Sequence, residues 1–234
     1  MDILPTNPCD KVERPNKGIF QGTFCNAGEI QALYNVIKGQ DIELIVKMAL
    51  FYGMRRGEII GLRWNAIDFT NDTITVNHTI VKDYENSGNA VIAKGRAKNK
   101  SSLRTYPLTA EFMQELQNRK MWIEENRKLC GKSYNKDWSE YVFVNVLGDL
   151  ITPDNVTYKF GQLIKANKLK PMRFHDLRHT CASLMVANDV NMKQIQDWLG
   201  HSTFTTTADI YSHLDSSSKQ LSANAMTEAL RNVS

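Results

Sequence analysis

The sequence predicts a mainly α-helical domain that carries a small antiparallel three-stranded β-sheet. Apolar residues recur at helical spacing in both the amino-terminal and the carboxyl-terminal parts of the chain. Between these parts, apolar and polar residues alternate over about residues 73–108, with turn-forming residues between the runs. The chain has 234 residues, of which 42% are hydrophobic and 23% charged, so it is long enough to bury a core.

The amino-terminal part is expected to begin with an extended segment and to continue as helices. Residues 1–22 contain several Pro and Gly and show little periodicity, which indicates an interdomain linker or arm. Asn26 with Glu29 three residues later predicts the start of a first helix. Asp41 is expected to cap a second helix, IELIVKMALFYG, which Gly53 ends. The run RRGEIIGLRW predicts a short third helix.

Three β-rich runs predict the strands of the sheet. They are TITVNHTIV, NAVIAKG and SSLRTYPL, with turn chemistry at 86–89 and 95–99. His78 lies in the first run and is expected to face solvent. The three runs together predict one antiparallel sheet of three strands.

The carboxyl-terminal part returns to helical periodicity. A long helix is expected from Thr109 to about Cys130, and YVFVNV is expected to form a short strand or a buried extended piece. Further helices are expected at 153–167, 174–188, 191–199, 205–213 and 217–231.

Composition favours a protein of the cytoplasm that contacts an acidic partner. No apolar run reaches the roughly 20 residues of a membrane span, and the start lacks a secretory signal. The four cysteines are scattered without a C-x-x-C pair, which suits a reducing compartment. The net charge is +4. The basic residues include two groups: Lys94, Arg96, Lys98, Lys100 and Arg104, and then Lys159, Lys165, Lys168, Lys170 and Arg173. Such groups form solvated faces or bind nucleic acid.

A metal site is one interpretation of the histidines near the carboxyl end. His175 and His179 are four residues apart on an expected helix, a spacing at which two histidines can share one zinc ion. The metalloprotease form of this motif places Glu after the first histidine, and this chain has Asp176 there. A third ligand would have to come from His201, His213 or a distant carboxylate. The pattern therefore favours a structural histidine pair over a zinc hydrolase.

Phosphoryl transfer is the other interpretation. Arginine stays charged and binds phosphate oxygens through two parallel hydrogen bonds, so two arginines from separate helices can grip one phosphate. Arg55 follows a helix end, and Arg178 comes three residues after His175, on the same helical face. Tyr211 supplies a nucleophile, provided that positive charge or a base lies near its hydroxyl, whose ordinary pKa is about 10.

Four motifs in order resemble a known family. YGMRRGEIIGLRW, AKNKSSLRTYPL, FHDLRHTCASLM and QDWLGHSTFTTTADIYSH resemble the catalytic domain of the tyrosine recombinases, the phage-integrase family. The resemblance is nearest to integrases of conjugative transposons and temperate phages, and it covers about residues 23–225. It implies the tyrosine-recombinase catalytic-domain fold.

The resemblance also implies a set of site residues. The catalytic set that it implies is Arg55, Lys98, His175, Arg178, His201 and Tyr211. Glu58 matches the acidic position that supports the site. For the lysine, the family run P-K-T-K-S corresponds to residues 97–101 and favours Lys98, and Lys100 is the alternative because the hairpin that carries the lysine varies in length among members. The family's proline before this lysine is Ala97 here.

The implied reaction needs no metal, ATP or other cofactor. Tyr211 would attack a DNA phosphodiester and form a 3′-phosphotyrosyl bond with release of a 5′-hydroxyl, and a hydroxyl of a partner strand would reverse the step. The two arginines would hold the non-bridging oxygens, and His175 would accept the tyrosine proton. Lys98 would protonate the leaving oxygen, and His201 would donate a hydrogen bond to the phosphate.

The resemblance further implies a domain arrangement and partners. The catalytic domain is expected at 23–216 and a tail helix at 217–234, which packs either on a neighbouring protomer or on its own domain. The family's amino-terminal core-binding domain is expected to be absent from the chain. The expected partners are double-stranded DNA, three further copies in a tetramer and accessory excision or DNA-bending proteins. The residues expected to bind DNA are Lys94, Arg96, Lys100, Arg104 and Arg173.

Two related functions remain open at this point. A type IB topoisomerase uses similar tyrosine chemistry but relaxes supercoils without exchanging partners. A catalytically inactive DNA-binding relative would keep the fold and lose part of the site, although all six implied catalytic residues are present.

Overall fold

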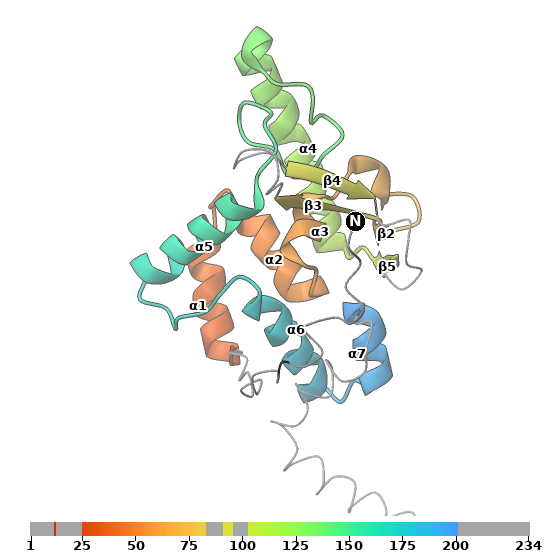
Figure 1. Ribbon diagram of the computed structural model, residues 1–234, viewed down its shortest axis with the longest axis vertical. Helices are drawn as coiled ribbons and strands as arrows, with labels where there is room; N and C mark the ends of the chain where they lie inside the picture. The colour runs from red at the N-terminus through yellow and green to blue at the C-terminus, as the bar shows by residue number, and fades with distance from the viewer. Residues whose placement is uncertain (1–11, 13–24, 83–90, 96–102, 201–234) are drawn as a thin grey trace, which may run out of the picture.

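The computed structural model describes residues 12, 25–82, 91–95 and 103–200. Within these ranges it is mainly helical with little β structure, which confirms the predicted fold class (Figure 1). The described helices are α1 (Ala27–Ile37), α2 (Glu43–Tyr52), α3 (Arg56–Ile60), α4 (Ala110–Cys130), α5 (Pro153–Ala166), α6 (Asp176–Ala187) and α7 (Met192–Leu199). None of these helices is long and apolar enough to cross a membrane.

Local signals set the ends of several helices. Asn26 accepts a hydrogen bond from the backbone nitrogen of Glu29, whose carboxylate accepts one from the backbone nitrogen of Asn26, so the predicted capping box is present. Gly53 ends α2 in the left-handed conformation, as predicted. Asp41 does not cap α2, because the helix begins at Glu43 after Ile42, and the Asp41 carboxylate pairs with Lys159 instead.

The predicted three-stranded antiparallel sheet is present with a different membership. Its strands are β1 (Ile67–Asp68), β2 (Thr73–Val76) and β5 (Arg104–Pro107), in the order β1-β2-β5. A separate two-stranded sheet pairs β3 (His78–Lys82) with β4 (Val91–Gly95). The run TITVNHTIV is therefore divided at Asn77, and its two halves pair with different partners.

The second sheet lies close to α3. A side chain at Gly57 would collide with the backbone oxygen of Ile80, and one at Gly61 would come within 2.9 Å of the Cα atom of Thr79. Both glycines therefore allow α3 to pack directly on the β3 backbone. This contact fixes the start of α3, which carries Arg55, relative to the hairpin.

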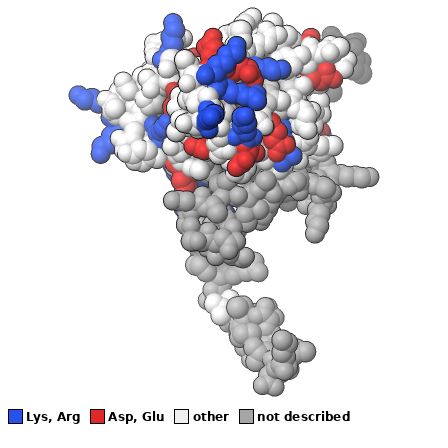
Figure 2. All heavy atoms as spheres, turned by 90° about the horizontal axis from the view of Figure 1, so that it is seen from above, with Lys and Arg blue, Asp and Glu red and all other residues white. Residues whose placement is uncertain are grey.

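The core extends from the helices to the segment that follows α4. Tyr141, Val142, Phe143 and Val144 are buried and form only isolated bridges, to Arg63 and Leu150. Of the two predicted alternatives, a short strand or a buried extended piece, the structure has the buried extended piece, over residues 141–144. The distal half of α4 projects from the body of the domain (Figure 1). Viewed from this end, Lys and Arg side chains gather near the middle of the face with acidic side chains beside them (Figure 2).

His78 does not face solvent as predicted. Its exposed fraction is 7%, and its Nε2 atom lies 3.1 Å from the Tyr141 hydroxyl and 3.2 Å from Nη2 of Arg63. Burial, followed by the charge of Arg63, lowers the pKa of His78. The alternation of the strand turns this residue toward the 141–144 segment, which is remote in sequence.

Candidate active site

Arg55 is fixed by the acidic residue three positions later. It occupies the N-cap position of α3, and its Nη1 atom lies 2.9 Å from Oε1 of Glu58. The backbone nitrogen of Arg55 donates to the other carboxylate oxygen, also over 2.9 Å. The Arg55 side chain remains 39% exposed. One carboxylate therefore orients a guanidinium whose remaining N–H groups can reach a ligand.

Glu58 also pairs with a second arginine, from β5. Nη2 of Arg104 lies 2.6 Å from Oε2 of Glu58, and both side chains are almost fully buried. The Nε atom of Arg104 donates to the Tyr106 hydroxyl over 2.9 Å. Glu58 thus joins an exposed arginine to a buried one.

Arg178 holds two helix ends together. It lies in α6 with an exposed fraction of 3%, and it donates to the carbonyl of Gly53 over 2.5 Å and to that of Leu199 over 2.7 Å. These carbonyls belong to the ends of α2 and α7, where backbone acceptors lack partners within their helix. Burial, followed by the charge of Arg55, lowers the pKa of Arg178 to about 9, so the guanidinium is charged at neutral pH.

His175 shares a pocket with Arg55. The pocket has a volume of about 610 Å³ and lies between the start of α3, strand β3, the start of α5 and the segment that leads into α6. Its lining includes Arg55, Arg56, Lys82, Arg173 and His175. The pocket therefore presents several cationic side chains beside a histidine, which suits a ligand that carries negative charge.

The imidazole of His175 is neutral at physiological pH. His175 keeps part of its surface exposed, and its partial desolvation, followed by the charges of His179, Arg178 and Arg55, lowers the pKa of His175 to about 4. The rings of His175 and His179 are perpendicular, with centroids 5.1 Å apart. A neutral imidazole beside cations can accept a proton, and an anion bound between the arginines would strengthen it as a base.

Comparison with known proteins identifies the family of the chain. The model of the phage integrase family matches residues 24–218, most of the chain. The chain belongs to the phage integrase family. This confirms the family that the four sequence motifs indicate.

Proteins similar to this chain include ones named as recombinases. The chain is 28% identical over 218 residues to the tyrosine recombinase XerC-like protein of Caldanaerobacter subterraneus, covering 91% of this chain and 54% of that protein. It is 26% identical over 231 residues to the ICEBs1 integrase of Bacillus subtilis, covering 98% of this chain and 61% of that protein. The chain thus spans only about half to three fifths of the length of these two relatives.

Solved structures of an integrase and of a recombinase share the fold of this chain. The Tn1549 transposon integrase, in complex with transposon right end DNA, superposes with a TM-score of 0.73 at 22% identity and covers 95% of this chain and 73% of that one. XerA recombinase superposes with a TM-score of 0.61 at 22% identity, covering 87% and 65% of the two chains. These matches support the predicted tyrosine-recombinase catalytic-domain fold.

The described part of the chain brings together some of the predicted site residues. Arg55, Glu58, His175 and Arg178 lie in one electrostatic neighbourhood, since the charges of Arg55 and Arg178 both act on His175. Arg173 lines the pocket and pairs with Asp176 over 3.4 Å. The predicted residues outside the described part are Arg96, Lys98, Lys100, His201 and Tyr211. For Lys94 only the backbone pairing of β4 with Thr79 is described.

Arg104 corrects one prediction. The sequence places it on a DNA-binding surface, but its exposed fraction is 7% and its guanidinium is paired with Glu58. A cation that is buried in an ion pair cannot contact a DNA backbone as a surface cation does. The reason is strand alternation: Arg104 and Tyr106 face inward, whereas Thr105 between them is exposed.

Sequence reasoning missed the residues that surround this buried arginine. The Tyr106 hydroxyl donates to the backbone oxygen of Trp198, and the Tyr106 ring packs against that of Trp198 with centroids 5.0 Å apart. Arg56 and Lys82 in the pocket also lie outside the predicted site. The period-two pattern of RTYPL contains the signal for Arg104 and Tyr106, because both residues alternate with exposed ones.

Proposed function

We propose that this chain is the catalytic part of a site-specific DNA recombinase, which cleaves and rejoins DNA strands through a phosphotyrosine bond to integrate or excise a mobile element. Its relatives are named as a tyrosine recombinase XerC-like protein and as the ICEBs1 integrase, and one structural neighbour is a transposon integrase in complex with transposon right end DNA. The pocket that Arg55 and His175 share carries the proposal. It combines an oriented phosphate-binding group with a neutral base.

In this proposal the nucleophile is Tyr211. Its oxygen attacks the phosphorus of a DNA phosphodiester, so that a phosphorus–oxygen bond to tyrosine forms and the bond to the 5′-oxygen breaks. His175 accepts the tyrosine proton, and Lys98, or Lys100 in its place, gives a proton to the departing 5′-oxygen. The phosphoester energy is kept in the protein–DNA bond, and attack by the 5′-hydroxyl of a partner strand recovers it. Such a cycle consumes no ATP.

The remaining cations bind and stabilise the phosphate. Arg55, held by Glu58, and Arg178 from α6 donate to the non-bridging oxygens, with His201 as a further donor. Loss of one such donor typically lowers the rate by about 100- to 1000-fold. Arg56, Lys82 and Arg173 line the same pocket and are placed to contact neighbouring phosphates.

Covalent capture of random DNA tests the nucleophile and identifies the cleaved sequence in the same experiment. A pool of duplexes with random sequence and one nick each is incubated with the chain. When the chain cleaves close to a nick, the short 5′-hydroxyl fragment between the two breaks diffuses away, so the protein–DNA bond cannot be reversed and is trapped. Denaturing gels isolate the covalent species, and sequencing returns the sites. The variants are Tyr211→Phe and, as a matched control, Tyr158→Phe, whose exposed fraction is 67%.

Capture by the wild type and by Tyr158→Phe, with loss in Tyr211→Phe, is the expected result. DNA bound without any covalent product would replace the proposal with an inactive DNA-binding relative. Relaxation of supercoiled plasmid without recombinant products, on plasmids that carry two recovered sites, would replace it with a topoisomerase. Capture that survives in Tyr211→Phe would show that another residue is the nucleophile.

The domain arrangement is part of the same proposal. The family match over 24–218 supports a catalytic domain at 23–216, after an arm at 1–22 and before a tail at 217–234. We place the protein in the cytoplasm as a tetramer on double-stranded DNA, with accessory proteins that bias excision. Removal of residues 217–234 should reduce assembly on DNA if the tail packs on a neighbouring protomer, and should leave assembly unchanged if it packs on its own domain.

A further inference from the structure

We propose that Arg104 is a positioning residue of the active site, which holds Glu58 in place for Arg55 and at the same time fixes the carboxyl end of α7. The inference rests on the proposed function and extends it to a residue to which the sequence motifs assign no part in the reaction. Arg104 touches no reacting atom in this proposal. It acts through the residues that it holds.

The first link runs from Arg104 to Arg55. The Glu58 carboxylate lies between them: Oε1 pairs with Nη1 of Arg55 over 2.9 Å, and Oε2 pairs with Nη2 of Arg104 over 2.6 Å. Oε2 also accepts from the backbone nitrogen of Arg55. Because the Glu58 side chain is fully buried, its position depends on these partners. A shift of Arg104 would therefore shift the carboxylate that orients Arg55.

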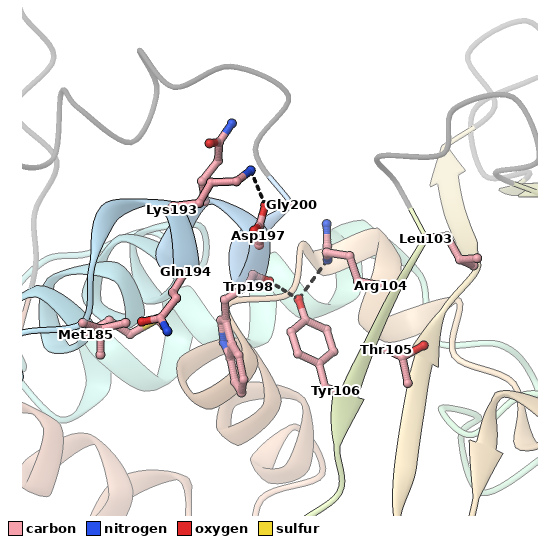
Figure 3. Close-up of a pocket in the computed structure, with 12 residues that line it drawn as sticks. Leu103, Arg104, Thr105, Tyr106, Met185, Lys193, Gln194, Asp197, Trp198 and Gly200 are labelled. Atoms are coloured by element: carbon pink, nitrogen blue, oxygen red, sulfur yellow. Dashed lines mark hydrogen bonds and ion pairs between the residues drawn. The ribbon is translucent and has the colours of Figure 1, made fainter.

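The second link runs from Arg104 to α7. Its Nε atom donates to the Tyr106 hydroxyl, which donates onward to the backbone oxygen of Trp198, as the dashed lines in Figure 3 show. Burial raises the pKa of Tyr106, so the hydroxyl keeps the proton that this chain of donors requires. The interaction runs from one strand to the last turn of a helix 92 residues later in the sequence.

The third link is steric and involves Gly200. This residue ends α7 at φ +64°, and a side chain there would collide with Nη1, Cδ and Cζ of Arg104. The guanidinium therefore lies directly against the glycine backbone, one residue before His201 in the sequence. A pocket of about 790 Å³ opens beside this contact and includes Arg104, Trp198 and Gly200 in its lining (Figure 3).

A role in stability alone explains this arrangement poorly. Desolvation of a buried ion pair offsets much of its Coulomb attraction, and apolar replacements of similar volume are often as stable. Nη1 of Arg104 is buried and has no hydrogen-bond partner among the described residues, which adds a further cost. The planar guanidinium instead pairs with Glu58 of α3, donates to Tyr106 of β5 and packs against Gly200 at the end of α7. It therefore holds these three elements in one fixed arrangement.

The test compares Arg104→Lys with Arg119→Lys on duplexes recovered by covalent capture. Lysine keeps the charge but cannot pair with Glu58 and Tyr106 at once. Arg119 is a matched control, because its guanidinium also ties its own element to a distant segment, by donating to the backbone oxygens of Val142 and Val144, and it lines neither of the two pockets described above. Single-turnover cleavage, the Kd for DNA and the melting temperature are measured for each.

We expect Arg104→Lys to lower the cleavage rate by about 100-fold, the cost of misplacing a reacting group, with the Kd for DNA changed by less than about twofold. Arg119→Lys should cleave at the wild-type rate. Because the effect passes through Glu58, the double variant with Glu58→Gln should cleave no more slowly than the slower single variant. Wild-type cleavage by Arg104→Lys, a parallel loss of DNA binding, or multiplicative effects in the double variant would overturn the inference.

A readout independent of cleavage separates this inference from the proposed function. A crystal structure of Arg104→Lys should show the Arg55 guanidinium displaced from Glu58, and an unchanged Arg55 would overturn the inference whatever the activity. If the wild type forms no covalent product while Arg55 is displaced in the variant, the proposed function fails and the positioning role of Arg104 stands.

Discussion

Arg178 donates a hydrogen bond to the backbone oxygen of Leu199 over 2.7 Å, and this contact joins the buried face of α6 to the end of α7. The same guanidinium donates to Gly53 at the end of α2. A residue expected to bind phosphate therefore also connects the three helices α2, α6 and α7.

Replacement of Arg178 by lysine should reduce both stability and cleavage. An ammonium group cannot reach both carbonyls with the geometry of a guanidinium, so one buried acceptor loses its partner, at a cost of about 1–3 kcal/mol. Cleavage should fall by at least about 100-fold at temperatures where the variant is folded. Urea unfolding and covalent capture measure the two effects. A variant as stable as the wild type would contradict the structural part of this prediction.

Replacement of Glu58 by glutamine should destabilise the domain strongly. The Arg104 guanidinium would stay buried without a counter-charge, and removal of one partner from a buried pair typically costs about 3–5 kcal/mol. Glu140→Gln is the matched control, because Glu140 is half exposed and lies 3.5 Å from Arg63. That control should change the free energy of unfolding by less than about 1 kcal/mol. Equal effects of the two substitutions in urea unfolding would exclude a special role for Glu58.

Replacement of Gly200 by alanine should cost more than the same change at Gly39. Both glycines have positive φ, +64° and +76°, so each substitution forces an L residue into the left-handed region at about 1–2 kcal/mol. At Gly39 the new methyl group meets no atom within 4 Å, whereas at Gly200 it collides with the Arg104 guanidinium. The collision should add about 1–3 kcal/mol. Thermal unfolding of both variants measures the difference. Equal melting temperatures would show that the Arg104 side chain moves aside without a cost in stability.

The parts of the fold that the sequence predicted are those with local causes. A capping box spans three residues, and a glycine that ends a helix acts on the turn before it, so the ends at Asn26 and Gly53 follow from short stretches. The first of the four family motifs is similarly local, because Arg55 and Glu58 lie on one turn and contact each other. Such features do not depend on the tertiary structure.

The features of the fold that the sequence did not predict depend on residues that are remote from each other in the sequence. Arg104 is buried because Glu58, 46 residues earlier, supplies its counter-charge, and His78 is buried because Tyr141, 63 residues later, covers it. Arg104 belongs to a basic run, and its charge alone does not distinguish it from the other cations of that run. The alternation of the strand places its side chain in the interior. The division of one β run at Asn77 likewise depends on which strand pairs with each half.

The protein should become less stable as the pH falls from 7 toward 4, and His175 should account for part of the change. The pKa of His175 is about 4 in the folded state, below its ordinary value of 6.5. Between these values the unfolded chain binds the proton and the folded chain does not, so the free energy of unfolding decreases as the pH drops through this window. Above pH 6.5 the imidazole is neutral in both states and contributes no slope. Burial also lowers the pKa values of His179 and His78, which act in the same direction.

His175→Asn removes the titration at this position and should therefore show a smaller loss of stability between pH 7.5 and pH 5. Urea unfolding of wild type and variant at the two pH values measures the difference. The residual loss in the variant reports the other two histidines, and a further change to asparagine at His179 should reduce it again. An identical loss in wild type and His175→Asn would mean that His175 takes up its proton in the folded state near pH 6.5, which the cations Arg55 and Arg178 beside it oppose.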